Sequence, residues 1–249
     1  MKLIILAAGQ GTRLRPLTDN IPKCMVEFKK KPIIDHILDA ASSCNIDNIC
    51  IVTGYKQDVL KDHLQSKRII YYSNPNYEKT NMVDTLFRAR DYLDGDIIIS
   101  YADIVYSDDI LQKLINFNEG ISVVVDKDWK QLWSLRMNNP LDDAETLKIN
   151  NNRIIELGRK PSGYGEIDAQ YIGLIKISKE VISSVINYYD SLPRGQMYDG
   201  KDFENMYMTS FLQLIIDNLM DVVPVEIQGG WYEIDSVQDL KAYTNIDTS

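Results

Sequence analysis

Short apolar segments alternate with amphipathic segments along the first half of the chain. The apolar runs predict strands at Lys2–Ala7, Asn48–Thr53, Arg68–Tyr72, Asp96–Ser100 and Ile121–Val125. Between them, apolar residues recur every three or four positions, which predicts helices over Ile33–Cys44, Asp58–Leu64, Asn81–Leu93 and Asp108–Phe117. Strands that alternate with helices favour a mostly parallel sheet covered on both faces, and so an α/β fold.

The second half of the chain has a different pattern. Glu145–Ile149 and Arg153–Leu157 flank three consecutive asparagines, which is typical of a hairpin. Further strands are predicted at Tyr171–Ile177, Val222–Glu226 and Trp231–Ile234, and helices at Lys179–Tyr189, Phe203–Leu219 and Val237–Tyr243. Because no internal repeat or Ser/Gly/Pro-rich linker interrupts the chain, we predict one domain over residues 1–249.

Charge is distributed unevenly along the 249 residues. The net charge is −9, which argues against nonspecific binding to nucleic acid or to an anionic membrane. Residues 1–31 carry seven lysines and arginines against two acids, so the remainder of the chain carries −14. A basic segment in an acidic protein suits a small polyanionic ligand, although Lys29, Lys30 and Lys31 also fit an exposed basic face.

The cysteines and the apolar runs indicate in which cellular compartment the protein is found. Cys24, Cys44 and Cys50 are an odd, scattered set that forms neither a disulfide framework nor a CxxC metal site. No apolar run approaches the roughly 20 residues of a membrane-spanning helix, and the first strand lacks a charged leader. We therefore expect a cytoplasmic protein.

A glycine-containing loop follows the first predicted strand. Gly9 and Gly11 would let backbone N–H groups approach an anion at the start of a helical turn. The same spacing also fits a tight structural turn. The loop is not a P-loop, since no GKS or GKT follows, and Leu14 stands where a dinucleotide-binding fingerprint needs a third glycine.

Two cations extend this loop. Thr12-Arg13 adds a guanidinium suited to bidentate phosphate contact, and Pro22-Lys23 supplies an ammonium group on a turn. The string LAAGxGTRL…PK resembles the signature of nucleotidyltransferases, which join a nucleoside triphosphate to a phosphorylated acceptor and release pyrophosphate. The resemblance implies a Rossmann-like three-layer sandwich of the GT-A type, with residues 1–126 binding nucleotide and residues 127–249 the acceptor.

The resemblance also implies roles for particular residues. Gly9, Gly11 and Arg13 would bind the β- and γ-phosphates, and Lys23 would stabilise charge in the transition state. The family reads the base with the first loop and with residues after the second and third strands. Here the positions implied for nucleotide binding, beyond those already named, are Leu6, Ala8, Thr12, Gly54, Tyr55 and Asn81. Asn81 is equally suited to cap the helix that follows it.

Two aspartates are candidate metal ligands. Asp103 follows a buried strand, at the edge where open α/β sheets gather functional groups, and Asp235 follows a short strand near the C-terminus. Each could instead cap the next helix. The family brings together an aspartate from each of these positions to hold a metal, so the resemblance implies Mg²⁺, held by Asp103 and Asp235.

Longer segments indicate a branch of the family. The opening block and the ending YEIDSVQDL (232–240) are similar to bacterial cytidylyltransferases, of which the phosphocholine enzymes are the best known. The middle of the chain resembles the capsular phosphoramidate branch, whose acceptor is a phosphorylated glutamine. The segments that carry this are KTNMV (79–83), SYADIVY (100–106), DDAETLK (142–148) and FENMYMTSF (203–211).

Candidate acceptor-binding residues follow from residue type and from one motif. Glu204 and Arg136 offer charges for the amino and carboxyl groups of a phosphoglutamine. Lys160 lies in RKP (159–161), where sugar-nucleotide relatives carry an EKP-like motif that meets the acceptor phosphate; a solvated surface lysine is the alternative. Arg159 replaces the glutamate that contacts a sugar hydroxyl in those relatives, which argues against a sugar acceptor.

The sequence therefore predicts Mg²⁺-dependent transfer of a cytidylyl group from CTP to a small phosphorylated acceptor, by a monomer or homodimer. Phosphoglutamine is the first acceptor expected and phosphocholine the next. The alternatives are a sugar-1-phosphate uridylyl- or thymidylyltransferase, and a regulatory subunit that keeps the fold without the chemistry. A regulatory subunit would lack Arg13, Lys23 or a metal aspartate, and this chain has them all. A glycosyltransferase is disfavoured because Asp103 is followed by Ile104-Val105 and not by a DxD motif.

Overall fold

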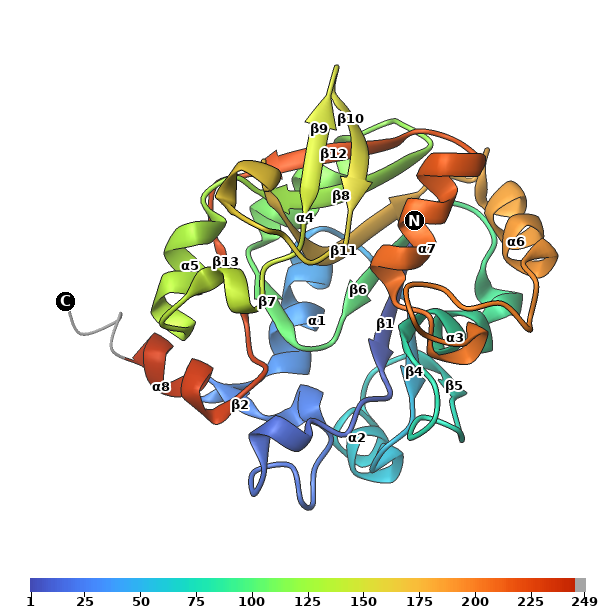
Figure 1. Cartoon of the computed structure of the whole chain (residues 1–249). Coiled ribbons are helices and arrows are strands. Elements are labelled where there is room, and N and C mark those ends of the chain that lie inside the picture. The colour runs from blue at the N-terminus through green and yellow to red at the C-terminus, as the bar shows by residue number, and fades with distance from the viewer. Residues whose placement is uncertain (245–249) are drawn as a thin grey trace.

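A seven-stranded sheet forms the centre of the computed structural model, which describes residues 1–244 (Figure 1). Its strands lie in the order β12 (Val222–Ile227), β8 (Ile121–Asp126), β11 (Gln170–Ile177), β6 (Ile97–Tyr101), β1 (Lys2–Ala7), β4 (Asn48–Thr53) and β5 (Ile69–Ser73). All pairings are parallel except those of β11, which runs antiparallel to β6 and β8. The prediction of a mostly parallel α/β sheet is confirmed.

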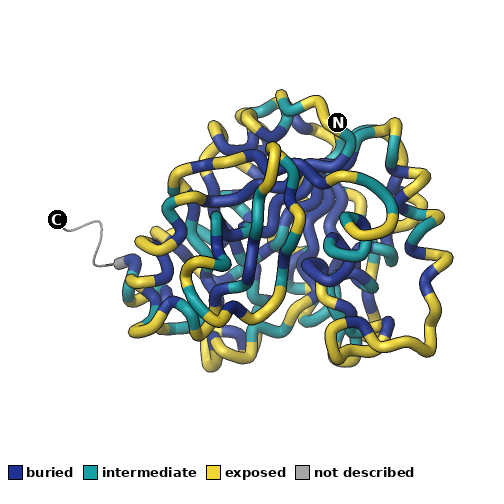
Figure 2. The backbone as a smooth tube through the Cα atoms, turned by 45° about the horizontal axis from the view of Figure 1, so that its top comes forward, coloured by how far each residue is buried: buried dark blue, intermediate teal, exposed yellow. Residues whose placement is uncertain are grey.

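Helices cover both faces of the sheet. Successive residues of a strand point to opposite sides, and both sets are apolar here, so each face has to be buried. On β1, Leu3 and Ile5 belong to one buried cluster, and Ile4 and Leu6 to the other. The first cluster includes residues of α1 (Ile33–Ser43), α2 (Gln57–His63), α4 (Asp108–Asn116), α5 (Trp129–Arg136) and α8 (Val237–Thr244). The second includes residues of α3 (Met82–Arg88), α6 (Ile182–Ser191) and α7 (Met208–Asn218). Figure 2 shows the buried backbone gathered between these layers.

Three small two-stranded sheets complete the fold. They pair β2 (Glu27–Phe28) with β3 (Lys31–Pro32), β9 (Leu147–Asn150) with β10 (Arg153–Leu157), and β7 (Ile104–Tyr106) with β13 (Trp231–Glu233). The hairpin β9–β10 matches its prediction. The pairing of β7 with β13 matters most for the site, because it brings the C-terminal segment to the carboxyl end of β6.

Two predicted helices are interrupted in the structure. Phe203–Leu219 divides into a 3₁₀ turn over Phe203–Asn205 and α7, because Asp202 caps the short turn by accepting a hydrogen bond from the Asn205 N–H (2.9 Å). Asn81–Leu93 likewise ends as an α-helix at Arg88 and continues as a 3₁₀ turn over Arg90–Tyr92. Helix α5, strand β7 and the β2–β3 pair lie outside the predicted elements. Within residues 1–244, no helix has the length and apolar character needed to cross a bilayer.

Candidate active site

The glycine loop follows β1 and leads into a 3₁₀ turn over Thr12–Leu14. Gly11 has a left-handed backbone, with φ of 62°. A Cβ at this position would lie 2.9 Å from the Lys23 Cβ, so glycine is required both by the backbone and by the close approach of Lys23. The hydroxyl of Thr18 donates to the Gly11 carbonyl (2.8 Å), which fixes the loop beneath the site.

The ammonium group of Lys23 lies between the two candidate metal ligands. Its Nζ is 2.7 Å from Oδ2 of Asp103 and 2.6 Å from Oδ1 of Asp235. Burial opposes the charged form of Lys23, but the two carboxylates outweigh it and raise the pKa above its usual value. Burial likewise opposes the charged form of Asp235, yet Lys23 holds the pKa of that carboxyl below its usual value.

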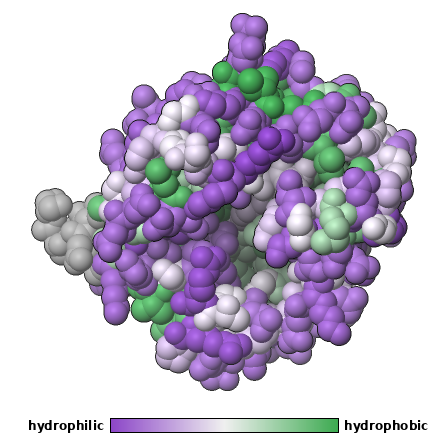
Figure 3. All heavy atoms as spheres, in the orientation of Figure 1, coloured by the Kyte–Doolittle hydropathy of each residue, from purple (hydrophilic) through white to green (hydrophobic). Residues whose placement is uncertain are grey.

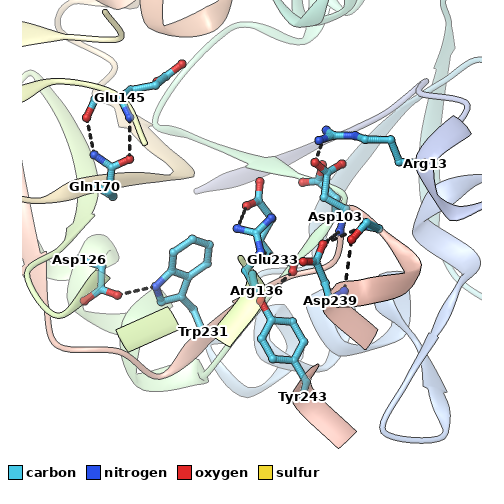
Figure 4. A network of polar contacts seen from close by, with 12 residues as sticks. Arg13, Asp103, Asp126, Arg136, Glu145, Gln170, Trp231, Glu233, Asp239 and Tyr243 are labelled. Atoms are coloured by element: carbon cyan, nitrogen blue, oxygen red, sulfur yellow. Dashed lines mark hydrogen bonds and ion pairs between the residues drawn. The ribbon is translucent and has the colours of Figure 1, made fainter. Parts of the chain in front are cut away.

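Backbone pairing explains how residues so distant in sequence meet. Glu233 pairs with Ile104 at the end of the β7–β13 ladder, and the Ile234 N–H donates to the Asp103 carbonyl at 2.8 Å. Asp235 therefore emerges beside Asp103. The guanidinium of Arg13 forms an ion pair with the second oxygen of Asp235. Figure 4 shows Arg13 and Asp103 close together in this part of the site. The sequence-predicted cations and aspartates thus form one cluster.

This cluster lines a cavity of about 260 Å³ at the carboxyl end of β1. Figure 3 shows a hollow in the corresponding face, with hydrophilic side chains around it. The predicted residues in the cavity wall are Leu6, Ala8, Gly9, Gly11, Thr12, Arg13, Lys23, Asn81, Asp103 and Asp235. Asn81 also caps α3, since its Oδ1 accepts from the Met82 N–H (2.8 Å); this confirms the capping alternative, and its part in nucleotide binding stays a prediction.

Gly54 and Tyr55 support this cavity from outside its wall. A Cβ on Gly54 would lie 2.8 Å from the Ala8 carbonyl oxygen, and the Tyr55 N–H donates to that oxygen at 3.1 Å. The Tyr55 hydroxyl donates to the carbonyls of Thr18 and Asp19. Both residues therefore contact the glycine loop without lining the cavity, and their role in nucleotide binding stays a prediction.

Sequence reasoning missed part of the cavity wall, contributed by the loop that precedes α3 and by α3 itself. Tyr77 and Thr80 of the loop and Thr85 of α3 line the cavity. The buried side chain of Asn74 ties the loop to the helix, because its amide donates to the hydroxyls of Thr80 and Thr85, both at 2.9 Å. The polar run Asn74-Pro75-Asn76 directly after a strand is the signal that could have indicated a functional loop.

Arg136 was expected at the acceptor, and the structure places it in a buried ion-pair network instead. Its guanidinium binds Glu233, and its Nε lies 3.0 Å from Oδ1 of Asp239 (Figure 4). The other oxygen of Asp239 accepts from the backbone N–H groups of Asp235 (3.0 Å) and Ser236 (2.7 Å). Arg136 therefore holds the segment that carries Asp235, and its side chain is only 3% exposed.

The other two residues expected at the acceptor also lie outside the cavity walls. Lys160 is exposed, and its Nζ donates to the carbonyls of Leu141 and Asp142, which matches the alternative of a surface lysine. The exposed Glu204 contributes its backbone carbonyl, which accepts from the Asn81 N–H at 2.9 Å.

A second cavity, of about 290 Å³, adjoins the first. The two share Arg13, Asn81, Met82 and Asp235. The remaining wall of the second cavity is rich in aromatic and acidic side chains, namely Tyr101, Trp133, Asp143, Glu145, Tyr171, Tyr207, Trp231 and Glu233. Trp231 is held in place by Asp126, whose Oδ2 accepts from the indole N–H at 2.9 Å (Figure 4). A molecule in this cavity would meet a nucleotide in the first one at their shared wall.

The two aspartates fit a hard divalent cation. Oδ1 of Asp103 is buried and has no hydrogen-bond partner among the described residues. Within residues 1–244, no third His, Cys, Asp or Glu completes a cluster with them, so water and phosphate oxygens would have to supply the other ligands. That donor set, one or two carboxylates with substrate phosphates, is the one typical of Mg²⁺.

Comparison with known proteins agrees with this geometry. Residues 2–163 match the family described as nucleotidyl transferase. The chain is 53% identical, over 97% of its length and 98% of the relative, to the CTP:phosphoglutamine cytidylyltransferase of Campylobacter jejuni subsp. jejuni serotype O:2. It is 28% identical to the choline-phosphate cytidylyltransferase of Streptococcus pneumoniae, over 99% of this chain and 98% of that one.

Solved structures resemble the fold over nearly its whole length. The inositol-1-phosphate CTP transferase from T. maritima aligns with a TM-score of 0.75 at 21% identity, covering 99% of this chain and 96% of that one. The CTP:phosphocholine cytidylyltransferase from Streptococcus pneumoniae aligns with a TM-score of 0.68 at 23% identity, covering 98% of each chain. With the glycine loop, the paired cations and the two aspartates in one cavity, this chain belongs to the nucleotidyl transferase family.

Proposed function

We propose that this protein transfers a cytidylyl group from CTP to a small phosphorylated acceptor, with phosphoglutamine as that acceptor. The observation that carries the proposal is the meeting of Arg13 and Lys23 with Asp103 and Asp235 in one cavity. The choice of CTP and phosphoglutamine rests on the 53% identity to the C. jejuni enzyme of that name.

In this reaction an oxygen of the acceptor phosphate attacks the α-phosphorus of CTP. The bond from the α-phosphorus to the bridging oxygen breaks, and pyrophosphate leaves with that oxygen. An acceptor phosphate is already ionised at neutral pH, so no protein nucleophile is needed. Catalysis then consists of positioning and of stabilising the negative charge that develops.

Different residues of the first cavity would bind the phosphates, stabilise the developing charge and hold the metal. Backbone N–H groups of the glycine loop and the guanidinium of Arg13 would bind the β- and γ-phosphates. Lys23 would stabilise negative charge at the α-phosphate. Asp103 and Asp235 would hold Mg²⁺, which when bound neutralises charge on the triphosphate and on the departing pyrophosphate.

The contact between the two cavities supports a direct approach of the acceptor to the nucleotide. The acceptor would occupy the second cavity and present its phosphate at the wall formed by Arg13 and Asp235, which both cavities share. An oxygen of that phosphate could then reach the α-phosphorus of a nucleotide in the first cavity. Residues 1–126 then supply most of the nucleotide cavity, and residues 127–249 most of the acceptor cavity.

The test is pyrophosphate release in the presence of Mg²⁺, crossing CTP, UTP, dTTP and ATP with phosphoglutamine, phosphocholine and glucose-1-phosphate. We expect release with CTP and phosphoglutamine. Release of pyrophosphate only with glucose-1-phosphate would show that the protein is a sugar-1-phosphate nucleotidyltransferase. No release with any pair, together with CTP binding in calorimetry, would indicate a regulatory protein and refute the proposal.

A further inference from the structure

The second cavity has an excess of negative charge that the protein itself leaves uncompensated. Among its acidic residues, Glu233 is paired with Arg136, and Asp235 with Arg13 and Lys23. Asp143 and Glu145 line the same cavity, and neither carboxylate has an ion pair within residues 1–244. A ligand that fills the space beside them without a positive charge would leave them desolvated and unpaired.

Two hydrogen bonds hold the backbone of Glu145, while its carboxylate has no hydrogen-bond or ion-pair partner among residues 1–244. The side-chain amide of Gln170, which is 3% exposed, accepts from the Glu145 N–H (3.1 Å) and donates to the Glu145 carbonyl (2.5 Å). Figure 4 shows the Glu145 side chain directed away from this pair of hydrogen bonds. A side chain positioned by its own backbone, and engaged with nothing else, is preorganised for a ligand.

The surroundings of Glu145 favour a cation. Burial, followed by the negative charges of Asp143 and Asp199, raises the pKa of Glu145 to about 7. The aromatic rings of Trp133, Tyr171, Tyr207 and Trp231 line the same cavity, and the faces of such rings attract ammonium groups. A positively charged group beside Glu145 would favour the ionised carboxylate, and it would also contact the faces of these aromatic rings.

We infer that Glu145 binds the ammonium group of the acceptor and so determines which acceptors are used. The acceptor would carry a phosphate at one end, meeting the wall shared with the nucleotide cavity, and an ammonium group at the other, meeting Glu145. The protein then discriminates against phosphorylated sugars and alcohols, which leave Glu145 unpaired. This inference rests on the proposed function, since it assigns the second cavity to the acceptor.

The test compares two acceptors and two variants. The acceptors are phosphoglutamine and its α-N-acetyl derivative, which differ in the ammonium charge. The variants are Glu145→Gln, which keeps the shape and the backbone hydrogen bonds to Gln170, and the control Glu156→Gln. Glu156 lies on β10 close in sequence but outside both cavity walls, so its substitution removes the same charge elsewhere.

For the native protein, N-acetylation of the acceptor should raise its KM by about tenfold to a hundredfold. This factor corresponds to the binding free energy lost with one hydrogen bond to a charged group. Glu145→Gln should raise the KM for phosphoglutamine by a similar factor and leave the KM for the acetylated acceptor and for CTP within about twofold. The Glu156→Gln protein should behave as the native protein does.

Equal losses on both acceptors in the Glu145→Gln protein would overturn the inference, because a merely structural residue would affect them alike. Unchanged KM values in that variant would overturn it as well. The proposed function fails in a different way: the native protein would then release no pyrophosphate from CTP with any acceptor. CTP affinity and the melting temperature of each variant verify that the nucleotide cavity and the fold are intact.

Discussion

The ammonium group of Lys23 lies 2.6 Å from the carboxylate of Asp235, across 212 residues of sequence. Asp103 completes the contact from the other side, at 2.7 Å. Lys23, which we propose stabilises the α-phosphate, therefore neutralises the two residues proposed to hold the metal. Nucleotide binding must redistribute these charges, which suggests that metal and nucleotide bind better together than either binds alone.

Replacing Lys23 should separate the two roles of this contact. Lys23→Gln should lower kcat by about a hundredfold to a thousandfold, as expected when a donor to a developing negative charge is lost. It should also tighten Mn²⁺ binding in the absence of nucleotide, because Asp103 loses its counter-cation and Asp235 keeps only Arg13. Electron paramagnetic resonance of free Mn²⁺ measures this directly. Lys30→Gln, which removes an exposed charge close in sequence but outside both cavity walls, should change neither quantity.

Two glycines of the loop should respond differently to the same substitution. Gly11→Ala places a Cβ 2.9 Å from the Cβ of Lys23 on a left-handed backbone, and should cost about 1–2 kcal/mol of stability together with most of the activity. Gly9→Ala meets nothing within 4 Å in the free protein, so its melting temperature should be unchanged while CTP binding weakens. Thermal unfolding and calorimetry distinguish the two. Equal melting temperatures would contradict the assigned role of Gly11.

Arg136 should prove a stabilising residue that acts on the site through its partners. Arg136→Met leaves the buried Asp239 and the half-buried Glu233 without their cation and should cost about 3 kcal/mol in the free energy of unfolding by urea. Arg90→Met, which breaks an exposed pair with Asp190, should leave the free energy of unfolding almost unchanged. A small loss for Arg136→Met would show that the network does not hold the Asp235 segment.

Glu145 should make stability and acceptor binding depend on pH. Its pKa is raised to about 7 in the folded protein by burial and by Asp143 and Asp199, above the roughly 4.3 of an unfolded chain. The folded state therefore holds the proton more tightly, so this group stabilises the protein least above pH 7. Relative to Glu145→Gln, the native protein should lose stability as the pH rises from about 4.3 to 7.

Acceptor binding should show the opposite trend. Below pH 7 the protonated Glu145 cannot pair with an ammonium group, so the acceptor KM should rise by up to about tenfold per pH unit. Burial, with a smaller contribution from the Glu145 carboxylate, raises the pKa values of Tyr101 and Tyr171 above 10, so both stay neutral throughout. The ratio of KM values between the native protein and Glu145→Gln isolates this effect from titration of the acceptor phosphate. A ratio that does not vary with pH would contradict it.

Local sequence predicts the nucleotide side of this protein well. The strand Lys2–Ala7, the loop with Gly11, and the positions of Asp103 and Asp235 after strands are all properties of short segments, and the structure places them as expected. The acceptor side depends on contacts between distant segments. Arg136 was assigned by charge alone, and only the packing of α5 against α8 shows that its partners are Glu233 and Asp239. Glu145 was recognisable only after the fold placed it opposite aromatic side chains.

The transfer itself is tested most directly by following the α-phosphorus of CTP. CTP labelled at that position would be incubated with phosphoglutamine, Mg²⁺ and the native protein, with Asp103→Asn as the inactive control. The account predicts that the label enters a CDP-linked product while an equal amount of unlabelled pyrophosphate is released, and that the Asp103→Asn protein does neither. Label found in CMP, or CTP left unconsumed by the native protein, would contradict the account.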